Sequence, residues 1–542
     1  MNTLHKYTAA TLSALIALTL AACSGESGQP SSSSPNAGNT GITESSSVPA
    51  SSSEAGPAEK DYSEHLTFNV AWTLVYGSDF NSDALAQEWN KRFNVEWEVT
   101  ALTDMDKLRI WINSGDMPDV AVWTYNHGEA LNYIEQELLY RLPDDWKQRW
   151  PNAAAAYGYT KLGDELEKVV GGTYILPRPI FTTNMATDPI VWHYMTCLRK
   201  DWAQAVNFPV KDTYTVDEIL EYARLIKAQD PGGLGDKLIP ISTNNTEALR
   251  LFIRTQNARA EGFYKDANGQ YQWGGADPET LEALKAYQAA FREGLMNPEF
   301  FSYKGSESRD AFWVSGQAGV VNCGGTCSLR YTNFNKFSSN IGTDPNDAVQ
   351  MTIVLDNQGV YHDVEVKNFG DNLIFSPDIS QEKFERFMDM VDYSTTEEGQ
   401  LLINAGFEGV DWERGANNEI VPLNDTPMKE KYPSQDPLFC NMYMMADNYS
   451  MVNPTIPQQF RDSIWNDYKT KVSLSSGDSI LKNDWQEYFF DSPSKQKVNF
   501  NYANEYAQLV VKDGDLEQNW KEWVESKMPL IQPVLDELNS MK

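Results

Sequence analysis

The residues best suited to chemistry are aromatic side chains that stand beside hydrogen-bonding groups at the predicted ends of strands. Trp72 closes the alternating run LTFNVAW, and Trp123, Tyr125 and Asn126 follow the apolar run MPDVAV. Aromatic rings stack on the C–H faces of sugars, and a few polar groups fix the orientation of a ligand in its cleft. We predict ligand contacts here, although both tryptophans can instead close the core of the protein.

Further candidates of the same two kinds lie in the middle and late parts of the chain. Their rings supply stacking, and their charges supply directed hydrogen bonds. We predict that a ligand contacts Trp192, Arg199, Trp313, Arg330, Glu408 and Trp412. Two of the charges also have a structural alternative, because Arg199 can pair with Asp201, and Glu408 can cap a turn between Gly406 and Gly409.

A catalytic role is the weaker interpretation of the acidic residues. Glycoside hydrolysis requires two carboxylates several ångströms apart, and Glu408 with Asp411 is a conceivable pair. However, a chain with 76 Asp and Glu residues contains many such pairs by chance. It contains no Gly-x-Ser-x-Gly or His-Glu-x-x-His motif. The sequence therefore predicts a binding protein that is not an enzyme and needs no cofactor.

Cysteine and histidine residues do not predict a metal site. After Cys23 four cysteines remain, and Cys323 and Cys327 are the only close pair. Outside the cell this pair can form a small disulfide loop or stay as free thiols, and both remain open. We expect Cys197 and Cys440 to be free and buried. The five histidines are scattered, so zinc binding is not expected.

The first part of the folded chain alternates between strand and helix patterns. LTFNVAW and FNVEWEVTAL alternate apolar and polar residues as strands do, and MPDVAVW is a short apolar run typical of a buried parallel strand. Helices are predicted over 80–92 and about 104–114, the second ended by Gly115. This β-α-β-α-β order predicts a doubly wound sheet whose ligand lies beyond the carboxyl ends of the strands.

The later patterns predict a second lobe and a return to the first. Thr215 and Glu218 form a capping box at the start of a helix. Asn268-Gly269 predicts the turn of a hairpin that would place Trp273 on the surface. Strand patterns recur at AGVVN and MTIVLD, and a helix at QEKFERFMDMVDYS. Several crossings between two α/β lobes would form a hinge.

The amino terminus predicts export and lipid anchoring. Residues 9–22 form an almost uncharged run that is shorter than the ~20 residues of a membrane-spanning helix. The run ends in Leu20-Ala21-Ala22-Cys23, which resembles a bacterial lipobox and implies that Cys23 becomes a lipidated first residue. Two acyl chains anchor a protein stably, whereas one does so only marginally. An ordinary secretion signal is the alternative.

Residues 24–60 contain almost no large apolar side chain and cannot offset the entropy cost of folding. We predict a disordered tether with a typical span of roughly 30–37 Å. The rest of the chain, about 480 residues, is too long for one core. The net charge of the whole chain, −32, argues against nucleic acid as a partner, and its 16 tryptophans suit a sugar-binding cleft.

Six blocks in one order resemble bacterial extracellular solute-binding proteins of family 1, the oligosaccharide receptors of ABC importers. These blocks are INSGDMPDVAVW (112–123), LRKDWAQAVNFP (198–209), YTVDEILEYARLIKAQDP (214–231), FREGLMNPEFF (291–301), YSTTEEGQLLINAGFEGVDWE (393–413) and DGDLEQNWKEWVES (513–526). The resemblance is strongest in type to the LipO-like lipoproteins of Gram-positive bacteria and to alginate-binding proteins. It implies a two-lobed periplasmic-binding-protein-like fold of type II that closes on its ligand by hinge bending.

This resemblance also implies the domain organisation. Residues 1–22 would be a lipoprotein signal peptide and 23–60 the lipidated cysteine with its tether. We expect the first lobe to combine 61–180 with about 305–395, and the second to combine 181–304 with about 396–500. Residues 501–542 would form carboxyl-terminal helices that pack on the lobes.

The sequence departs from the family in one loop. Many of the larger members hold a calcium ion after the helix that begins with Thr-Val-Asp-Glu. Here the loop is DPGGLGDKLIP (230–240), in which only Asp230 and Asp236 carry carboxylates. Calcium takes six to eight oxygen ligands, so we predict no metal site.

The combined interpretation is a monomeric receptor, lipid-anchored on the outer face of the cytoplasmic membrane of a Gram-positive bacterium. It would capture an oligosaccharide and deliver it to the permease subunits of an ABC importer. The alternatives are a surface glycosidase or lyase, a receptor for a peptide or another non-sugar solute, and a surface scaffold.

Overall fold

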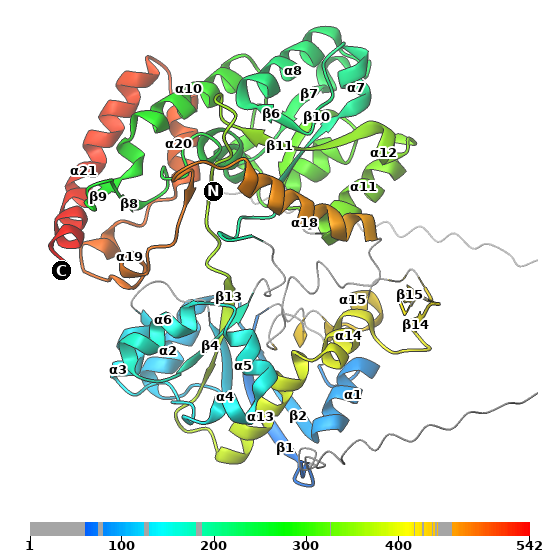
Figure 1. Ribbon diagram of the computed structural model, residues 1–542, viewed down its shortest axis with the longest axis vertical. Coiled ribbons are helices and arrows are strands. Elements are labelled where there is room, and N and C mark those ends of the chain that lie inside the picture. The colour runs from blue at the N-terminus through cyan, green and yellow to red at the C-terminus, as the bar shows by residue number, and fades with distance from the viewer. Residues whose placement is uncertain are drawn as a thin grey trace, which may run out of the picture. The chain divides into compact units, whose positions relative to one another are not determined.

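Two five-stranded sheets, each flanked by helices, organise the chain in a computed structural model (Figure 1). The structure describes residues 60–541 except 74–79, 124–128, 180–186, 326, 417, 425, 427, 436, 439–441 and 443–457. The segment Met1–Lys60 separates from the unit Asp61–Lys542. The predicted signal peptide, the lipidation site Cys23 and the tether therefore lie outside the described residues, apart from Lys60.

The first sheet has the strand order β2-β1-β3-β13-β4. Its strands are β1 (Leu66–Trp72), β2 (Val95–Ala101), β3 (Val120–Trp123), β4 (Ile175–Pro179) and β13 (Phe369–Phe375). The strands β1, β2 and β3 pair in parallel, and β13 is antiparallel to both β3 and β4. The predicted β-α-β-α-β unit is confirmed, with α1 (Ala84–Phe93) and α2 (Met105–Ser114) as its helices.

Alternation along the strands places apolar side chains on both faces of this sheet. Phe68 and Val70 of β1 enter a core with α1 and α13 (Gln381–Ser394), and Ala71 enters a second core with α2. The helix α2 begins and ends as predicted: the carboxylate of Asp104 accepts hydrogen bonds from two amides of the first turn, and Gly115 has the left-handed φ of 78°.

The second sheet has the strand order β6-β11-β5-β10-β7. Its strands are β5 (Met195–Arg199), β6 (Thr213–Thr215), β7 (Ile239–Ser242), β10 (Ala318–Cys323) and β11 (Val349–Leu355). The strand β5 is antiparallel to its neighbours β10 and β11, whereas β10 and β7 are parallel. One core contains α8 (Val216–Gln229), α10 (Pro278–Arg292), α20 (Tyr502–Val511) and α21 (Leu516–Ser540). The other contains α11 (Cys327–Ile341) and α18 (Gln458–Ser473).

Shorter elements connect these layers. The described helices among them are α3 (Glu129–Glu135), α4 (Trp146–Arg149), α5 (Pro151–Tyr157), α6 (Leu162–Val170), α7 (Lys200–Ala205), α9 (Asn245–Ala248), α12 (Pro345–Ala348), α14 (Glu397–Ala405), α15 (Met428–Lys431) and α19 (Trp485–Phe489). Three two-stranded ribbons pair β8 (Phe263–Lys265) with β9 (Tyr271–Trp273), β12 (Asp363–Val364) with β16 (Ile480–Leu481), and β14 (Trp412–Arg414) with β15 (Ile420–Pro422). None of the helices in the described part of the chain has the length and apolar character required to span a bilayer.

Two local predictions at helix and hairpin ends are confirmed. Thr215 accepts a hydrogen bond from the Glu218 amide while the Glu218 carboxylate accepts one from the Thr215 amide, so the capping box of α8 forms. Gly269 has a φ of 75° in the turn of the β8–β9 hairpin, a value that glycine adopts without strain.

Trp273 does not lie on the surface as predicted. It is 3% exposed, and its indole donates a hydrogen bond to the Tyr502 hydroxyl. Its ring also packs against Trp523 of α21. The hairpin is therefore covered by the carboxyl-terminal helices, which the local turn pattern does not report.

The predicted assignment of the returning segments to the lobes is wrong in two places. The strands β10 and β11, expected in the first lobe, lie in the second sheet. Conversely, Leu402 and Ile403 of α14, expected in the second lobe, pack in the core of the first sheet with Tyr432 and Leu438. Strand patterns alone did not reveal which sheet each returning strand joins, because pairing partners lie more than a hundred residues away.

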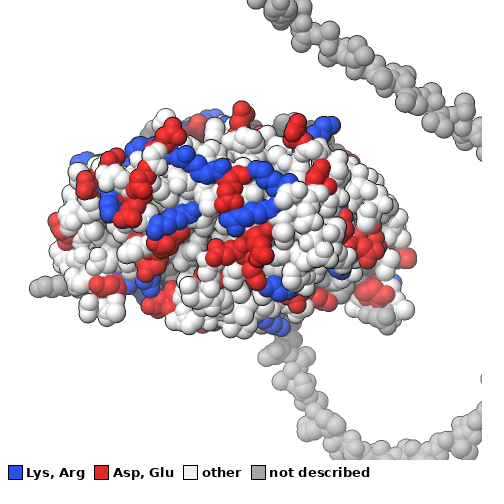
Figure 2. Space-filling model, turned by 90° about the horizontal axis from the view of Figure 1, so that it is seen from above, with Lys and Arg blue, Asp and Glu red and all other residues white. Residues whose placement is uncertain are grey.

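Side chains of both charge signs alternate on one face of the protein. Figure 2 shows Lys and Arg interspersed with Asp and Glu on the face that is seen from above. The net charge of −32 is therefore not expressed on this face as one acidic field.

Candidate functional site

The carboxyl ends of the parallel strands are the places where doubly wound folds bind ligands. In the first sheet the chain that follows β1, β3 and β4 lies outside the described residues. Arg178 and Asp371 form an ion pair of 3.6 Å at this edge, and the Asn372 amide donates to the carbonyl of Trp123. The side-chain oxygen of Asn372 is buried and has no hydrogen-bond partner among the described residues.

The second sheet presents a richer polar group at the same type of edge. Tyr194 precedes β5, Asn322 lies near the end of β10, and Glu247 and Arg250 follow β7; we call these four residues the edge cluster. The Arg250 guanidinium lies 3.6 Å from the centre of the Tyr194 ring and 3.0 Å from the Glu247 carboxylate. Burial raises the pKa of Glu247 above its ordinary value.

Three atoms of the edge cluster are buried without a hydrogen-bond partner in the described part of the chain. They are Glu247 Oε2, Arg250 Nε and Asn322 Oδ1. An unpaired buried polar group costs about 1–3 kcal/mol, so native proteins rarely retain several of them together without a use. The cluster therefore holds two acceptors and one donor that are buried without a described partner, at the edge where the fold places ligands.

A pocket of about 1150 Å³ opens next to this edge, which we call the hairpin pocket. The β8–β9 hairpin, the β12–β16 ribbon, α19 and the segment 491–502 form its walls, and Glu129 of α3 adds a side chain from the first sheet's helices. Ring side chains line it: Trp192, Phe263, Tyr264, Trp485, Phe500 and Tyr502. Its size and its mixture of rings and polar groups suit a small saccharide.

Ion pairs hold the walls of the hairpin pocket in place. Arg254 donates to both oxygens of Glu261, at 2.8 and 3.0 Å. Lys265 lies 2.9 Å from Asp484, which also accepts a hydrogen bond from the Tyr271 hydroxyl. Although burial alone would raise it, the pKa of Asp484 is lowered, because these two donors stabilise the carboxylate. The ion pair and the hydrogen bond to Asp484 thus join the hairpin to the start of α19 at the pocket.

Among the residues predicted to bind a ligand, Trp192 lines this pocket. Its ring is half-buried, and its amide lies 3.3 Å from the Asp363 carboxylate. The rings of the next two residues, His193 and Tyr194, lie 6.0 and 5.7 Å from it in edge-on and tilted contacts, which places Trp192 beside the edge cluster. Tyr125 and Asn126 lie outside the described residues.

The other predicted tryptophans and arginines have places in the core. Trp72 and Trp123 are fully buried on the two faces of the first sheet, so the core alternative describes both. Trp313 stacks on Phe337 at 4.9 Å in the core of the second sheet. In this conformation none of the three presents a surface to a ligand.

Arg199 and Arg330 are also buried, and their donors are occupied. Arg199 pairs with Asp201, as the structural alternative predicted, and its guanidinium lies 4.3 Å from the centre of the Trp202 ring. Arg330 donates to the Gly325 carbonyl at 2.6 Å and pairs with Asp467 of α18. Both arginines therefore stabilise the second lobe in this structure.

The last pair of candidates belongs to the β14–β15 ribbon. Glu408 is exposed at a turn, and Trp412 is 5% exposed with its indole donating to the Gly406 carbonyl. Neither lies on the hairpin pocket. The neighbouring Asp411 accepts hydrogen bonds from the Phe407 amide and the Tyr432 hydroxyl and pairs with Lys431.

Sequence reasoning missed the edge cluster and most of the hairpin pocket. Asn322 ends the strand pattern AGVVN, so the carboxyl-end rule that selected Trp72 would also have selected it. Glu247 and Arg250 carry no such signal, because they follow β7 inside a short helical stretch that begins at Asn245. Phe500 and Tyr502 reach the pocket from the carboxyl-terminal part of the chain, which no local pattern connects to the hairpin.

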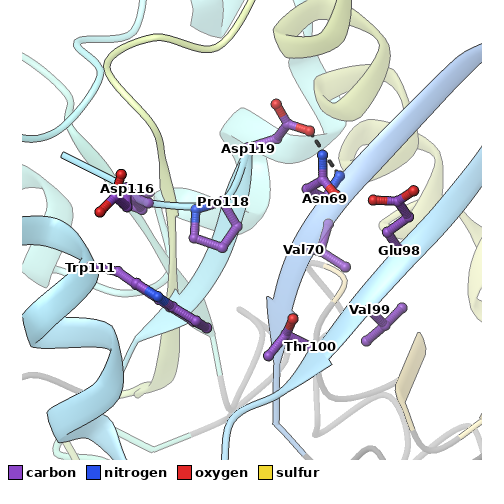
Figure 3. A pocket seen from close by; sticks show the side chains of 10 residues that line it. Asn69, Val70, Glu98, Val99, Thr100, Trp111, Asp116, Pro118 and Asp119 are labelled. Atoms are coloured by element: carbon purple, nitrogen blue, oxygen red, sulfur yellow. Dashed lines mark hydrogen bonds between the residues drawn. The ribbon is translucent and has the colours of Figure 1, made fainter. Parts of the chain in front are cut away.

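A second, smaller pocket of about 540 Å³ lies on the first sheet (Figure 3). Trp111 of α2 stands on one side of it, and Glu98 and Val99 of β2 stand on the other. Asp119, which precedes β3, accepts a hydrogen bond from the Asn69 amide and pairs with Lys383. Since Pro118 and Asp119 lie at the amino end of β3, this pocket is away from the edge that binds ligands in doubly wound folds.

In the loop 230–240 the Asp230 carboxylate accepts hydrogen bonds from backbone amides of the same loop. Asp230 ends α8 with a φ of 44°, and its two oxygens accept hydrogen bonds from the amides of Leu234 and Gly235 at 2.9 and 2.8 Å. These amides occupy the oxygens that a calcium ion would need, and Asp236 is exposed. Within the described residues no cluster of three His, Cys, Asp or Glu side chains is arranged to hold a metal.

Cys323 is a free buried thiol, as is Cys197. Burial raises the pKa of Cys323 to about 12, so the thiolate is strongly disfavoured. Of the two alternatives left open for the Cys323 and Cys327 pair, the structure therefore shows the free thiol at Cys323. Cys440 lies outside the described residues.

Comparison with known proteins identifies the fold. No protein-family model matches the chain, and no curated protein matches it. Solved structures match 88% of this chain at 16% identity: the alginate-binding protein AlgQ2 without calcium ion, with a TM-score of 0.64 over 98% of its chain, and the ABC-transporter substrate-binding protein FusA of S. pneumoniae in complex with kestose, with 0.62 over 98%. An extracellular solute-binding protein of Bifidobacterium longum subsp. infantis matches with a TM-score of 0.60 over 99% of its chain.

The fold is therefore one that these substrate-binding proteins of ABC transporters also have. The predicted α/β architecture, two sheets of five strands flanked by helices, is confirmed. At this level of identity the likeness concerns the fold, and the ligand has to be argued from the residues of this chain.

Proposed function

We propose that this protein is an extracellular solute-binding receptor of an ABC importer, and that its ligand is an oligosaccharide. The observation that carries the proposal is the hairpin pocket, which six ring side chains line together with polar groups, and whose Trp192 packs against Tyr194 of the edge cluster. Rings provide stacking for sugar faces, and unpaired donors and acceptors meet hydroxyl groups. The fold supports the proposal, because it is shared with proteins described as binding alginate and kestose.

A glycan panel tests the proposal. Any ligand that binds only the folded state raises the melting temperature, by an amount that grows with ligand concentration. We expect one class of oligosaccharide to raise the melting temperature while a peptide panel does not. If peptides raise the melting temperature and glycans do not, the ligand is a non-sugar solute. If neither panel changes the melting temperature, the proposal of a solute receptor is contradicted.

An enzyme is the competing function, and the geometry of Asp411 disfavours it. The Lys431, Phe407 and Tyr432 donors more than offset burial and lower the pKa of the Asp411 carboxyl, so it does not carry the proton that a general acid must donate. Both of its oxygens are engaged in holding the ribbon turn. The assay is to incubate the protein with each bound oligosaccharide and to measure reducing ends. We expect no increase over the buffer control.

Delivery to a permease and anchoring at Cys23 complete the proposed function. The lipobox-like segment supports lipidation and a place on the outer face of the membrane, and one copy per ligand is the proposed stoichiometry. The test is expression in a Gram-positive host with Cys23→Ala as the variant. We expect the unaltered chain in the membrane fraction and the variant in the medium or uncleaved. Equal distribution of both chains would contradict the anchor.

Closure of two lobes on the ligand is the proposed conformational step. The first lobe would comprise the first sheet with its helices, and the second lobe the second sheet with its helices. Small-angle scattering with and without the bound oligosaccharide tests it, because closure reduces the radius of gyration. An unchanged scattering curve at saturating ligand would contradict closure.

A further inference from the structure

The wall of the hairpin pocket carries an ammonium group that forms no ion pair with a described residue. Lys367 lies in the pocket, half-buried, with its Nζ 5.3 Å from the centre of the Tyr488 ring. It makes no hydrogen bond and no ion pair with any residue that the structure describes. Burial lowers the pKa of Lys367, as expected for an ammonium that has lost part of its hydration.

The acidic groups around Lys367 are already engaged with other partners. The Glu487 carboxylate lies 2.7 Å from the Lys495 ammonium, and the Glu365 carboxylate accepts a hydrogen bond from the Asn483 amide at 2.8 Å. Both carboxylates are therefore near Lys367, but neither forms an ion pair with it. A cation kept partly desolvated and unpaired is costly, and this cost is recovered when a ligand supplies the counter-charge.

Among the other carboxylates of the pocket, Asp491 accepts a hydrogen bond from the Gln496 side chain and has no cationic partner among the described residues, whereas the rest are paired. Glu129 lies 2.7 Å from Arg109. Glu261 is held by Arg254 and Asp484 by Lys265, while Asp478 lies 3.5 Å from Arg259. Pairing thus removes most of the negative charge from the walls in a protein whose net charge is −32. The Lys367 ammonium stands next to aromatic side chains, since Trp485 lines the pocket and packs at 5.5 Å on Tyr488, the ring that Lys367 approaches.

We propose that Lys367 determines specificity by binding a carboxylate on the ligand, and that the ligand is therefore an acidic oligosaccharide containing hexuronic acid. This inference rests on the proposed function. An ammonium and a carboxylate form a charge-assisted hydrogen bond, which is roughly twice as strong as a bond between neutral groups. The aromatic wall receives the sugar ring that carries the carboxylate.

Lys482 is a matched control within the same pocket. It also lines the pocket and has no hydrogen bond or ion pair to a described residue, but it is exposed. Water solvates an exposed ammonium well, so that a new ion pair there contributes little. A variant at Lys482 removes the same charge from the pocket without removing the desolvated group.

The experiment is calorimetric titration of the full-length protein with trigalacturonate and with its fully methyl-esterified form, which has the same rings without the charge. We expect the unaltered protein to bind the acid at least tenfold more tightly than the ester. Lys367→Met should abolish this preference, Lys367→Arg should retain it, and Lys482→Met should change it less than twofold. Thermal unfolding of each variant verifies that it is folded.

The outcomes separate this inference from the proposed function. Binding of neutral panel glycans with no preference for trigalacturonate or for any other uronic-acid oligosaccharide over its ester would overturn the inference and leave the receptor intact. A preference that survives in Lys367→Met would also overturn it. Failure to bind any saccharide would overturn both.

Discussion

Replacing Arg330 by methionine should destabilise the second lobe and leave ligand affinity unchanged. The Arg330 side chain is 1% exposed, and it donates to the Gly325 carbonyl at 2.6 Å and to the Ser463 hydroxyl at 3.2 Å. It also forms an ion pair with Asp467, which joins α18 to α11. Methionine fills much of the same volume but supplies no charge and no donor.

The magnitude follows from the burial of the two partners. Removing one member of a buried ion pair costs roughly 3–5 kcal/mol. Asp467 retains 20% exposure and has Lys471 at 3.9 Å, so the lower end applies and we expect a loss of about 3 kcal/mol in the free energy of unfolding. At roughly 2–4 °C per kcal/mol for a cooperative unit of 150–250 residues, the melting temperature should fall by about 6–12 °C.

The assay combines scanning calorimetry with ligand titration on the same preparation. The double variant Arg330→Met with Asp467→Leu is the control, because replacing both partners by apolar side chains leaves no unpaired charge and should recover most of the lost stability. An unchanged melting temperature together with a tenfold loss of glycan affinity would refute the reasoning. Arg330 would then contact the ligand, as its residue type alone had suggested.

Three further predictions concern the pocket, the ribbon and the calcium-like loop. Trp192→Ala should weaken oligosaccharide binding about tenfold through lost stacking, whereas Trp111→Ala beside the smaller pocket should not, as titration will show. Folding lowers the pKa of Asp411 below 3.8, so the ionised Asp411 carboxylate stabilises the folded state above that pH and this stabilisation is lost as the pH falls. The variant Asp411→Asn removes the ionisable partner of Lys431, and its melting temperature should therefore change less between about pH 5 and 3 than that of the unaltered protein. Adding millimolar calcium and then a chelator should leave the melting temperature unchanged, since the Asp230 oxygens are taken by loop amides; a rise with calcium would contradict this.

The carboxyl-end rule selected Trp72 and Trp123, and the structure buries both side chains. Trp72 ends β1 as predicted, yet it packs between Phe80 and Trp97 and faces no ligand. Strand alternation predicts that a side chain points to one face of the sheet, but it does not tell whether a helix covers that face. Trp192 was predicted from its residue type, and it lines the pocket beside the β12–β16 ribbon, where its amide lies 3.3 Å from the Asp363 carboxylate.

Sequence by itself determined the features that depend on neighbours within a few residues. Such features are the residue patterns of β1 and β3, the capping box at Thr215, and the left-handed glycines at the end of α2 and in the hairpin. Hydrogen bonds and side-chain directions over one turn decide them.

Only the tertiary structure decided which sheet β10 and β11 join, that Trp273 is buried beneath Trp523, and that Lys367 forms no ion pair with a described residue of the pocket. Each of these depends on contacts between segments that are far apart in the chain. The burial of a side chain and the pairing of a charge depend on which segments are in contact in the folded protein, and local sequence patterns do not specify those contacts.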